Sequence, residues 1–224
     1  MLAAKNFLAR QLKRRGKFAF VHSLARDARV LDAGCGDDSP RRAKALRADL
    51  HYIGLDVGDY HQSVAPGLHA DSYIIASPEG FAQEIAKFEG QLDAVISSHN
   101  LEHCHRPDDV LEAMFKALNR QGRMYLSFPC RESVSFPSRS GALNFYDDPT
   151  HRSVPDFDKI CALARSRGLR IDFAARRYRP TALMLLGLAL EPLGALLGKN
   201  MPAGSTWALY GFESVLWLSN SATT

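Results

Sequence analysis

Short apolar runs alternate with segments of helical periodicity along the first part of the chain. Runs that are too short for a helix and that end at turns predict strands at 29–36, 51–56, 92–98 and 123–128, with a short third strand at 67–71. Apolar positions at helical spacing predict helices at 41–50, 78–88 and 107–118. Strands that alternate with helices in this way predict an α/β fold with a mostly parallel sheet covered on both faces.

The second part of the chain departs from this simple alternation. Residues 130–154 are predicted to form a long polar loop, and loops of this length are usually functional or disordered. A helix at 156–166, a strand at 169–177, an apolar insertion at 180–204 and an aromatic-rich last strand at 207–218 follow. Leucines cluster around Glu191 and Pro192, so the insertion is expected to form two short helices rather than a membrane span.

Composition and charge narrow the class of protein. The chain has 224 residues, of which 46% are hydrophobic and 23% charged, which is ordinary for one globular domain covering 1–224. The net charge of +4 is concentrated in a predicted basic cap helix within 1–27. Such a helix can contact an anionic membrane surface, but the pattern favours a solvated amphipathic cap, and nothing else in the sequence indicates nucleic acid. Scattered cysteines and the lack of a signal-like segment lead us to expect a cytoplasmic protein.

A glycine turn carries the first chemical signal. Gly34 and Gly36 follow an apolar strand that contains Asp32, and a helix is predicted after them. Glycines allow the backbone to approach a ligand closely, and a helix N-terminus attracts negative groups. Asp56 ends the next strand, at the position that binds ribose hydroxyls in dinucleotide-binding folds. Together these features predict a cofactor that contains adenosine.

The same residues carry a resemblance to a known family. Val30-Leu-Asp-Ala-Gly-Cys-Gly36 resembles the first motif of class I S-adenosylmethionine-dependent methyltransferases. The resemblance continues through 52–56, 92–103 and 118–129, and so covers about 28–130, leaving 131–224 as the acceptor-side half. Leu101-Glu-His103 is similar to the branch that methylates small molecules and cell-surface glycans. The resemblance implies a doubly wound, seven-stranded, Rossmann-like sheet whose last strand is antiparallel, with 180–204 as a helical insertion before it.

The resemblance also implies which residues bind S-adenosylmethionine. Gly34 and Gly36 would line the methionine and ribose, Asp32 would lie near the ammonium group, and Asp56 would bind the ribose. Asp71 would approach the adenine, while Ser98, His99 and Asn100 would lie under the sulfonium. In this chain the third glycine of the motif is replaced within Asp37-Asp-Ser-Pro40.

The acceptor side offers several histidines. Methyl transfer needs an in-line nucleophile, often deprotonated by a base. His151 in the long loop is the first candidate for this base and His99 the second, with His103 and Tyr146 also possible; the alternative for His151 is a structural role in a turn. His99 to His103 also spells H-x-x-E-H, a zinc-peptidase pattern. Because His99 directly follows a strand and Pro107 follows closely, no metal is expected.

Two other classes of function stay open beside methyl transfer to an oxygen or nitrogen of a small molecule or lipid-linked glycan. One is a non-catalytic protein that binds S-adenosylmethionine and acts as a regulator or partner. The other is a nicotinamide-dependent oxidoreductase on a related fold. The insertion at 180–204 is expected to be a lid over the acceptor, a homodimer interface or a lipid contact.

Overall fold

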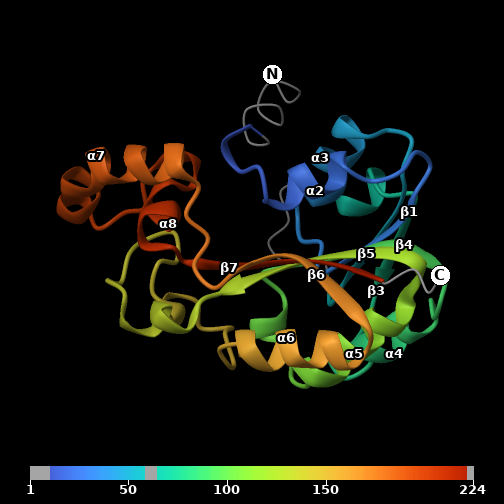
Figure 1. The fold of residues 1–224 in the computed structure, drawn as a ribbon. Coiled ribbons are helices and arrows are strands. Elements are labelled where there is room, and N and C mark those ends of the chain that lie inside the picture. The colour runs from blue at the N-terminus through green and yellow to red at the C-terminus, as the bar shows by residue number, and fades with distance from the viewer. Residues whose placement is uncertain (1–10, 59–64, 221–224) are drawn as a thin grey trace.

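The protein is built around one seven-stranded sheet with the order β3-β2-β1-β4-β5-β7-β6 (Figure 1). The structure, a computed structural model, describes residues 11–58 and 65–220. The strands are β1 (Arg29–Ala33), β2 (His51–Asp56), β3 (Ser72–Ile75), β4 (Leu92–Ser98), β5 (Leu118–Pro129), β6 (Leu169–Ala175) and β7 (Glu213–Asn220). Only β7 runs antiparallel to its neighbours, β5 and β6. The expected α/β sheet with an antiparallel last strand is therefore confirmed.

Helices cover both faces of the sheet (Figure 1). They are α2 (Lys17–His22), α3 (Ser39–Leu46), α4 (Phe81–Ala86), α5 (Pro107–Ala117), α6 (Phe157–Ser166), α7 (Thr181–Leu197) and α8 (Ser205–Tyr210). Helices α2 and α3 lie on one face and α4, α5 and α6 on the other, while α7 and α8 lie together beyond one end of the strands. Of the basic cap helix predicted within 1–27, residues 1–10 lie outside the described residues, and α2 is much shorter than expected.

The hydrophobic core consists of two layers, one on each side of the sheet. Val30 packs with Phe20 of α2 and Ala43 of α3, whereas its neighbour Leu31 packs with residues of α4, α5 and α6, such as Met114. Successive strand residues point to opposite faces, so a strand covered on both faces must be apolar throughout. This explains why the central strands appear in the sequence as continuous apolar runs.

The carboxyl ends of the central parallel strands meet at one edge of the sheet. Ala33, the last residue of β1, pairs with Leu55 of β2 on one side and with Ser97 of β4 on the other. The chain leaves β1 through α3 on one face of the sheet and leaves β3 through α4 on the other, so the strand order reverses beside β1. Open α/β sheets bind ligands at such a switch point.

The third strand lies further along the chain than predicted. Residues 67–71 were expected to form it, but Pro66–Leu68 is a short 3₁₀ turn and β3 begins at Ser72. Pro66 and Gly67 favour a turn over a strand. The β-favouring residues of this edge strand, 73–75, are aromatic or β-branched and lie just beyond the predicted range.

The start of the last strand was also misplaced. The segment predicted to be a strand over 207–218 begins with α8, and β7 starts only at Glu213. Gly211 ends α8 in the left-handed conformation, with φ of 64°. The aromatic residues of α8 favour a strand when the sequence is considered alone. In the structure Trp207 lies within the helix, and its indole N–H donates a hydrogen bond to the carbonyl of Ala142.

The insertion forms one long helix, α7, and not the two short helices expected. Pro192 lies inside α7 and removes one backbone donor, toward the carbonyl of Leu188. Leu188 is exposed, so water can satisfy that carbonyl. Gly187 allows α7 to pack closely on α8, because a Cβ there would lie 2.3 Å from the Ser205 carbonyl oxygen. In the described part of the chain no helix has the length and apolar character to cross a membrane.

Candidate active site

A cavity of about 1640 Å³ opens at the carboxyl edge of the sheet. It is lined by the glycine turn after β1, the end of β2, the turn after β4, residues 148–152 of the long loop and part of the N-terminal segment. Binding sites for one small molecule usually measure ~300–1,000 Å³. This cavity therefore has room for a cofactor and a second molecule.

The glycine turn forms one wall of the cavity. Gly34 has φ of 73° and lies against Asn100, because a Cβ on Gly34 would be 2.5 Å from the Asn100 Oδ1. Gly36 has φ of 60°, and a Cβ there would meet no atom within 4 Å. Gly34 is thus required by the packing of the protein itself, while Gly36 borders open space that a ligand can enter.

Asp56 lies beside this turn at the end of β2. Its Oδ2 accepts a hydrogen bond of 2.7 Å from the Gly36 N–H, and its Oδ1 accepts one of 2.8 Å from the Val57 N–H. The side chain is nearly buried but lines the cavity. The structure therefore brings Gly34, Gly36 and Asp56 together, as the sequence predicted.

Asp32 is buried behind the turn and is not among the residues that line the cavity. Its Oδ2 lies 2.6 Å from the Nζ of Lys17 and accepts a hydrogen bond from the Tyr52 hydroxyl. Lys17 also donates to the Ser39 Oγ at 2.6 Å and does line the cavity. The group presented at this wall is thus the Lys17 ammonium, with Asp32 as the anion that holds it there.

Asp71 does not line the cavity. Its carboxylate forms an ion pair of 2.8 Å with Lys44 and accepts a hydrogen bond of 2.7 Å from the Tyr52 N–H. Lys44 keeps the pKa of Asp71 below its ordinary value even though burial opposes this. Because Asp71 precedes β3 and is not among the cavity-lining residues, the structure does not bring it to the predicted cofactor site.

The turn after β4 forms the floor of the cavity. Ser98, His99 and Asn100, which the sequence predicted to lie under the sulfonium, all line it. The Ser98 Oγ lies 2.9 Å from the Ser127 Oγ of β5. His99 has φ of 53°, a conformation that costs a non-glycine residue about 1–3 kcal/mol, and its N–H donates to the Ser127 carbonyl at 2.8 Å.

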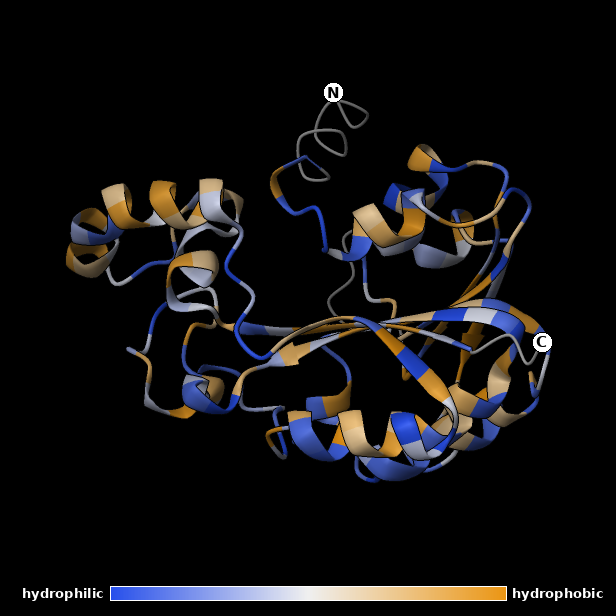
Figure 2. Cartoon of the chain, in the orientation of Figure 1, coloured by the Kyte–Doolittle hydropathy of each residue, from blue (hydrophilic) through white to orange (hydrophobic). Residues whose placement is uncertain are grey.

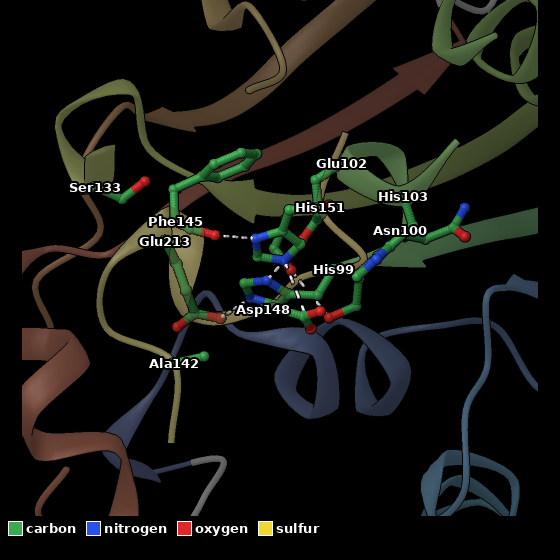
Figure 3. A network of polar contacts seen from close by, with 12 residues as sticks. His99, Asn100, Glu102, His103, Ser133, Ala142, Phe145, Asp148, His151 and Glu213 are labelled. Atoms are coloured by element: carbon green, nitrogen blue, oxygen red, sulfur yellow. Dashed lines mark hydrogen bonds and ion pairs between the residues drawn. The ribbon is translucent and has the colours of Figure 1, made fainter. Parts of the chain in front are cut away.

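The His99 ring lies between two carboxylates (Figure 3). Its Nδ1 is 3.1 Å from the Oε1 of Glu102, and its Nε2 is 3.3 Å from the Oε1 of Glu213. Lys13 pairs with the other oxygen of Glu213 at 2.7 Å. Burial opposes protonation of His99, but its bonds to the two carboxylates outweigh burial and raise its pKa to about 9.

The other end of the cavity carries the predicted acceptor residues. The His103 and His151 rings face each other with centroids 4.8 Å apart, and both line the cavity (Figure 3). The Nδ1 of His151 lies 2.6 Å from the Phe145 carbonyl oxygen, and its Nε2 is 3.9 Å from Asp148. Tyr146, also considered in the sequence, is 73% exposed and does not line the cavity.

Several residues of the site were not found by sequence reasoning. The sequence predicts Lys13 and Lys17 only as basic residues of a cap helix, because their partners, Glu213 and Asp32, lie far away in the chain. Glu213 lies 114 positions from His99 in the chain, so no local motif connects the two. Trp207, whose ring centroid is 5.1 Å from that of His99, had been assigned to a strand.

The sequence matches a known family over most of its length. Residues 4–172 match the family described as methyltransferase domain. A ubiquinone biosynthesis O-methyltransferase of Marinobacter nauticus is 33% identical over 114 residues, which are 48% of this chain and 47% of that protein. The match therefore spans about half the length of that relative. An enzyme of the same name from Pseudomonas putida strain F1 is 26% identical over 164 residues, 68% of this chain and 69% of its own.

The fold matches solved structures as well. An S-adenosylmethionine-dependent methyltransferase from Mesorhizobium loti shares it with a TM-score of 0.61 and 15% identity, over 94% of this chain and 97% of the other. The likeness extends across both halves of the sheet. With the glycine turn, Asp56 and the cavity at the switch point, the chain belongs to the methyltransferase domain family and has the fold of class I S-adenosylmethionine-dependent methyltransferases.

Proposed function

We propose that this protein transfers the methyl group of S-adenosylmethionine to an oxygen or nitrogen of a small molecule or a lipid-linked glycan. The observation that carries the proposal is one cavity whose two ends carry different chemical groups. The glycine turn and Asp56 lie at one end, and His103 and His151 at the other. The names of the relatives support an oxygen acceptor on a small molecule. Family and fold together favour neither the regulator nor the oxidoreductase alternative.

The residues at the glycine turn fit the cofactor that the family implies. Gly36 borders open space, Asp56 presents a carboxylate that suits ribose hydroxyls, and Lys17 presents an ammonium group that suits the cofactor's carboxylate. When bound, S-adenosylmethionine supplies an electrophilic methyl group on a sulfonium. The chain's own residues hold and orient it, and Asp32 keeps Lys17 in place.

His151 is placed to act on the acceptor. A carbonyl oxygen can only accept a hydrogen bond, so the Nδ1 of His151 must donate to Phe145. In the neutral ring this leaves the lone pair on Nε2, which can take a proton from the acceptor. His99, the second candidate base, differs because both of its nitrogens face carboxylates and its raised pKa keeps it protonated at neutral pH. We assign His99 to the shape and charge of the cavity floor.

The exposed face of α7 supports a lipid-linked acceptor. Figure 2 shows α7 as largely apolar, although it lies on the outside of the protein. Its exposed leucines are Leu185, Leu186, Leu188, Leu193, Leu196 and Leu197. We propose that this leucine face touches the surface of a cytoplasmic membrane, with a homodimer interface as the competing explanation.

Replacing Asp56 with alanine should weaken binding of S-adenosylmethionine by about 1–3 kcal/mol, because charge-assisted bonds to the ribose are lost. Isothermal titration calorimetry measures this directly. Asp71→Ala is the matched control, since Asp71 is also a carboxylate near the end of a strand but lies off the cavity. Thermal melts would verify that both variants fold. Equal affinity in the wild type and Asp56→Ala would overturn the cofactor assignment.

Replacing His151 with alanine should lower turnover by about 10²–10⁴-fold, the usual contribution of a general base, while cofactor affinity is kept. Release of S-adenosylhomocysteine, measured with an acceptor found by screening phenols and amines, checks this. His51→Ala, on the exposed start of β2, serves as the control. Turnover close to normal in His151→Ala would return His151 to a structural role in its loop.

The raised pKa of His99 predicts a pH dependence of stability. The folded-state pKa of about 9 exceeds the ordinary 6.5, so the stabilisation is fully present below pH 6.5 and is lost as the pH rises through 9. Urea unfolding across this range should show a falling free energy of unfolding in the wild type and a flatter profile in His99→Gln. Parallel profiles for the two proteins would show that the His99 charge does not stabilise the fold.

Replacing Leu188, Leu196 and Leu197 together with serine should abolish co-sedimentation with phospholipid vesicles if α7 touches lipid. Leu68→Ser is the control, because Leu68 is 81% exposed at a distant surface. Analytical ultracentrifugation of the same proteins tests the alternative. A wild-type dimer that becomes a monomer in the triple variant, without any vesicle binding, would replace the lipid contact with a homodimer.

A further inference from the structure

We propose that Glu102, His103 and His151 form a binding site for a divalent transition-metal ion at the acceptor end of the cavity. One ligand atom from each of the three lies within 4.8 Å of the others. Two of the residues follow β4 and the third lies in the long loop, so the linear spacing does not predict the cluster. The role of the ion in methyl transfer rests on the proposed function, whereas the existence of the metal site does not.

Hydrogen bonds orient both imidazole rings for metal binding. The Thr150 hydroxyl donates its single proton to Asp148 at 2.6 Å, so it must accept from the Nδ1 of His103 at 2.9 Å. The Nδ1 of His151 likewise donates to the Phe145 carbonyl. In both neutral rings the lone pair is therefore on Nε2. Histidine ligands of metals typically have this arrangement, with the second nitrogen held by a hydrogen bond to an oxygen.

Glu102 supplies an unused anionic oxygen. Its side chain is fully buried, and its Oε1 faces the Nδ1 of His99. Its Oε2 is buried and has no hydrogen-bond partner among the described residues. An unpaired carboxylate oxygen away from water is costly, and a cation removes that cost. The contact with His99 then holds the other oxygen, as outer partners of ligating carboxylates do.

The donor set indicates the class of ion. Two imidazole nitrogens and one carboxylate oxygen suit zinc or another first-row divalent ion, and such sites keep one position open for a further ligand. Ligands at ~2.1 Å from one zinc ion lie about 3.4 Å apart in a tetrahedron. The three side chains must therefore close in on the ion by small rotations. His103 and His151 line the cavity, so the open position faces the acceptor.

The ion would bind the acceptor through an oxygen. A hydroxyl group coordinated to a divalent cation loses its proton more readily, and here the proton leaves to solvent. The oxygen lone pair then forms the new O–CH₃ bond as the S–CH₃ bond breaks, and its electron pair stays on sulfur. With the ion bound, the Nε2 of His151 serves as a ligand and no longer as the base.

The test uses the whole protein after treatment with a chelator and dialysis. Titration with Co²⁺, followed by visible absorption, and with Zn²⁺, followed by calorimetry, should show one ion per chain. Removal of a residue that hydrogen-bonds to a metal ligand typically lowers metal affinity by ~10–100-fold. His103→Ala and His151→Ala each remove a ligand itself and should lower the affinity for metal by more than this. Thr150→Val, which removes the bond that orients His103 together with the bond to Asp148 but no ligand, should lose about 10–100-fold. His105→Ala, in the same cavity but outside the cluster, should bind as the wild type does.

The outcomes separate this inference from the proposed function. Absence of binding, or equal binding by the wild type and the two histidine variants, would overturn the metal site. If Asp56→Ala still weakened cofactor binding in that case, the proposed function would stand without the ion. Metal binding in a protein that does not bind S-adenosylmethionine would support the site and contradict the proposed function. Thermal melts without metal would show that each variant folds.

Discussion

The architecture of the cavity depends on two buried carboxylates, Glu102 and Glu213, each of which contacts a basic side chain. A carboxylate that loses water on folding must find a cation or strong hydrogen-bond donors, or the folded state pays several kcal/mol. His99 contacts both carboxylates, and Lys13 contacts Glu213. Because these groups come from the N-terminal segment, the turn after β4 and the start of β7, their pairing fixes three distant parts of the chain against one another.

The two ends of the cavity are positioned by different means. At the cofactor end the backbone itself is fixed, because the Gly36 N–H donates to Asp56 and so joins the ends of β1 and β2. At the acceptor end His103 lies in the turn after β4 and His151 in the long loop, and one hydrogen bond from its Nδ1 orients each ring. Loops on a rigid scaffold tolerate change, which is how one fold serves many acceptors.

Local sequence patterns were sufficient for the parts of the fold that local physics determines. The predicted bounds of β2 and β4 agree with the structure, because both strands are buried on both faces and end at turns. Gly34, Gly36 and Asp56 could be placed since a turn and a strand end bring them together. β3 was misplaced because the predicted range, 67–71, stopped just before its own aromatic and β-branched residues.

The remainder of the site depends on contacts between distant residues. Asp71 has the residue type that its predicted role requires, but it precedes β3 and forms an ion pair with Lys44 away from the cavity. The meeting of Glu213 with His99 depends on the antiparallel placement of β7 beside β5. The single helix α7 can include Pro192 because the carbonyl that loses its donor belongs to the exposed Leu188. None of these contacts can be predicted from the residues that neighbour the affected position in the sequence.

The direction of β7 also determines how the first and last described parts of the chain relate to the cavity. Running antiparallel, β7 starts with Glu213 beside Pro129 at the cavity edge and ends with Asn220 beside Leu169 at the opposite edge. Asn220 is held there by a hydrogen bond from its amide to the Asn119 carbonyl. Lys13 and Lys17, by contrast, line the cavity itself. A fusion partner or surface tether attached beyond Asn220 would thus leave the cavity mouth accessible, whereas one placed just before Lys13 would crowd it.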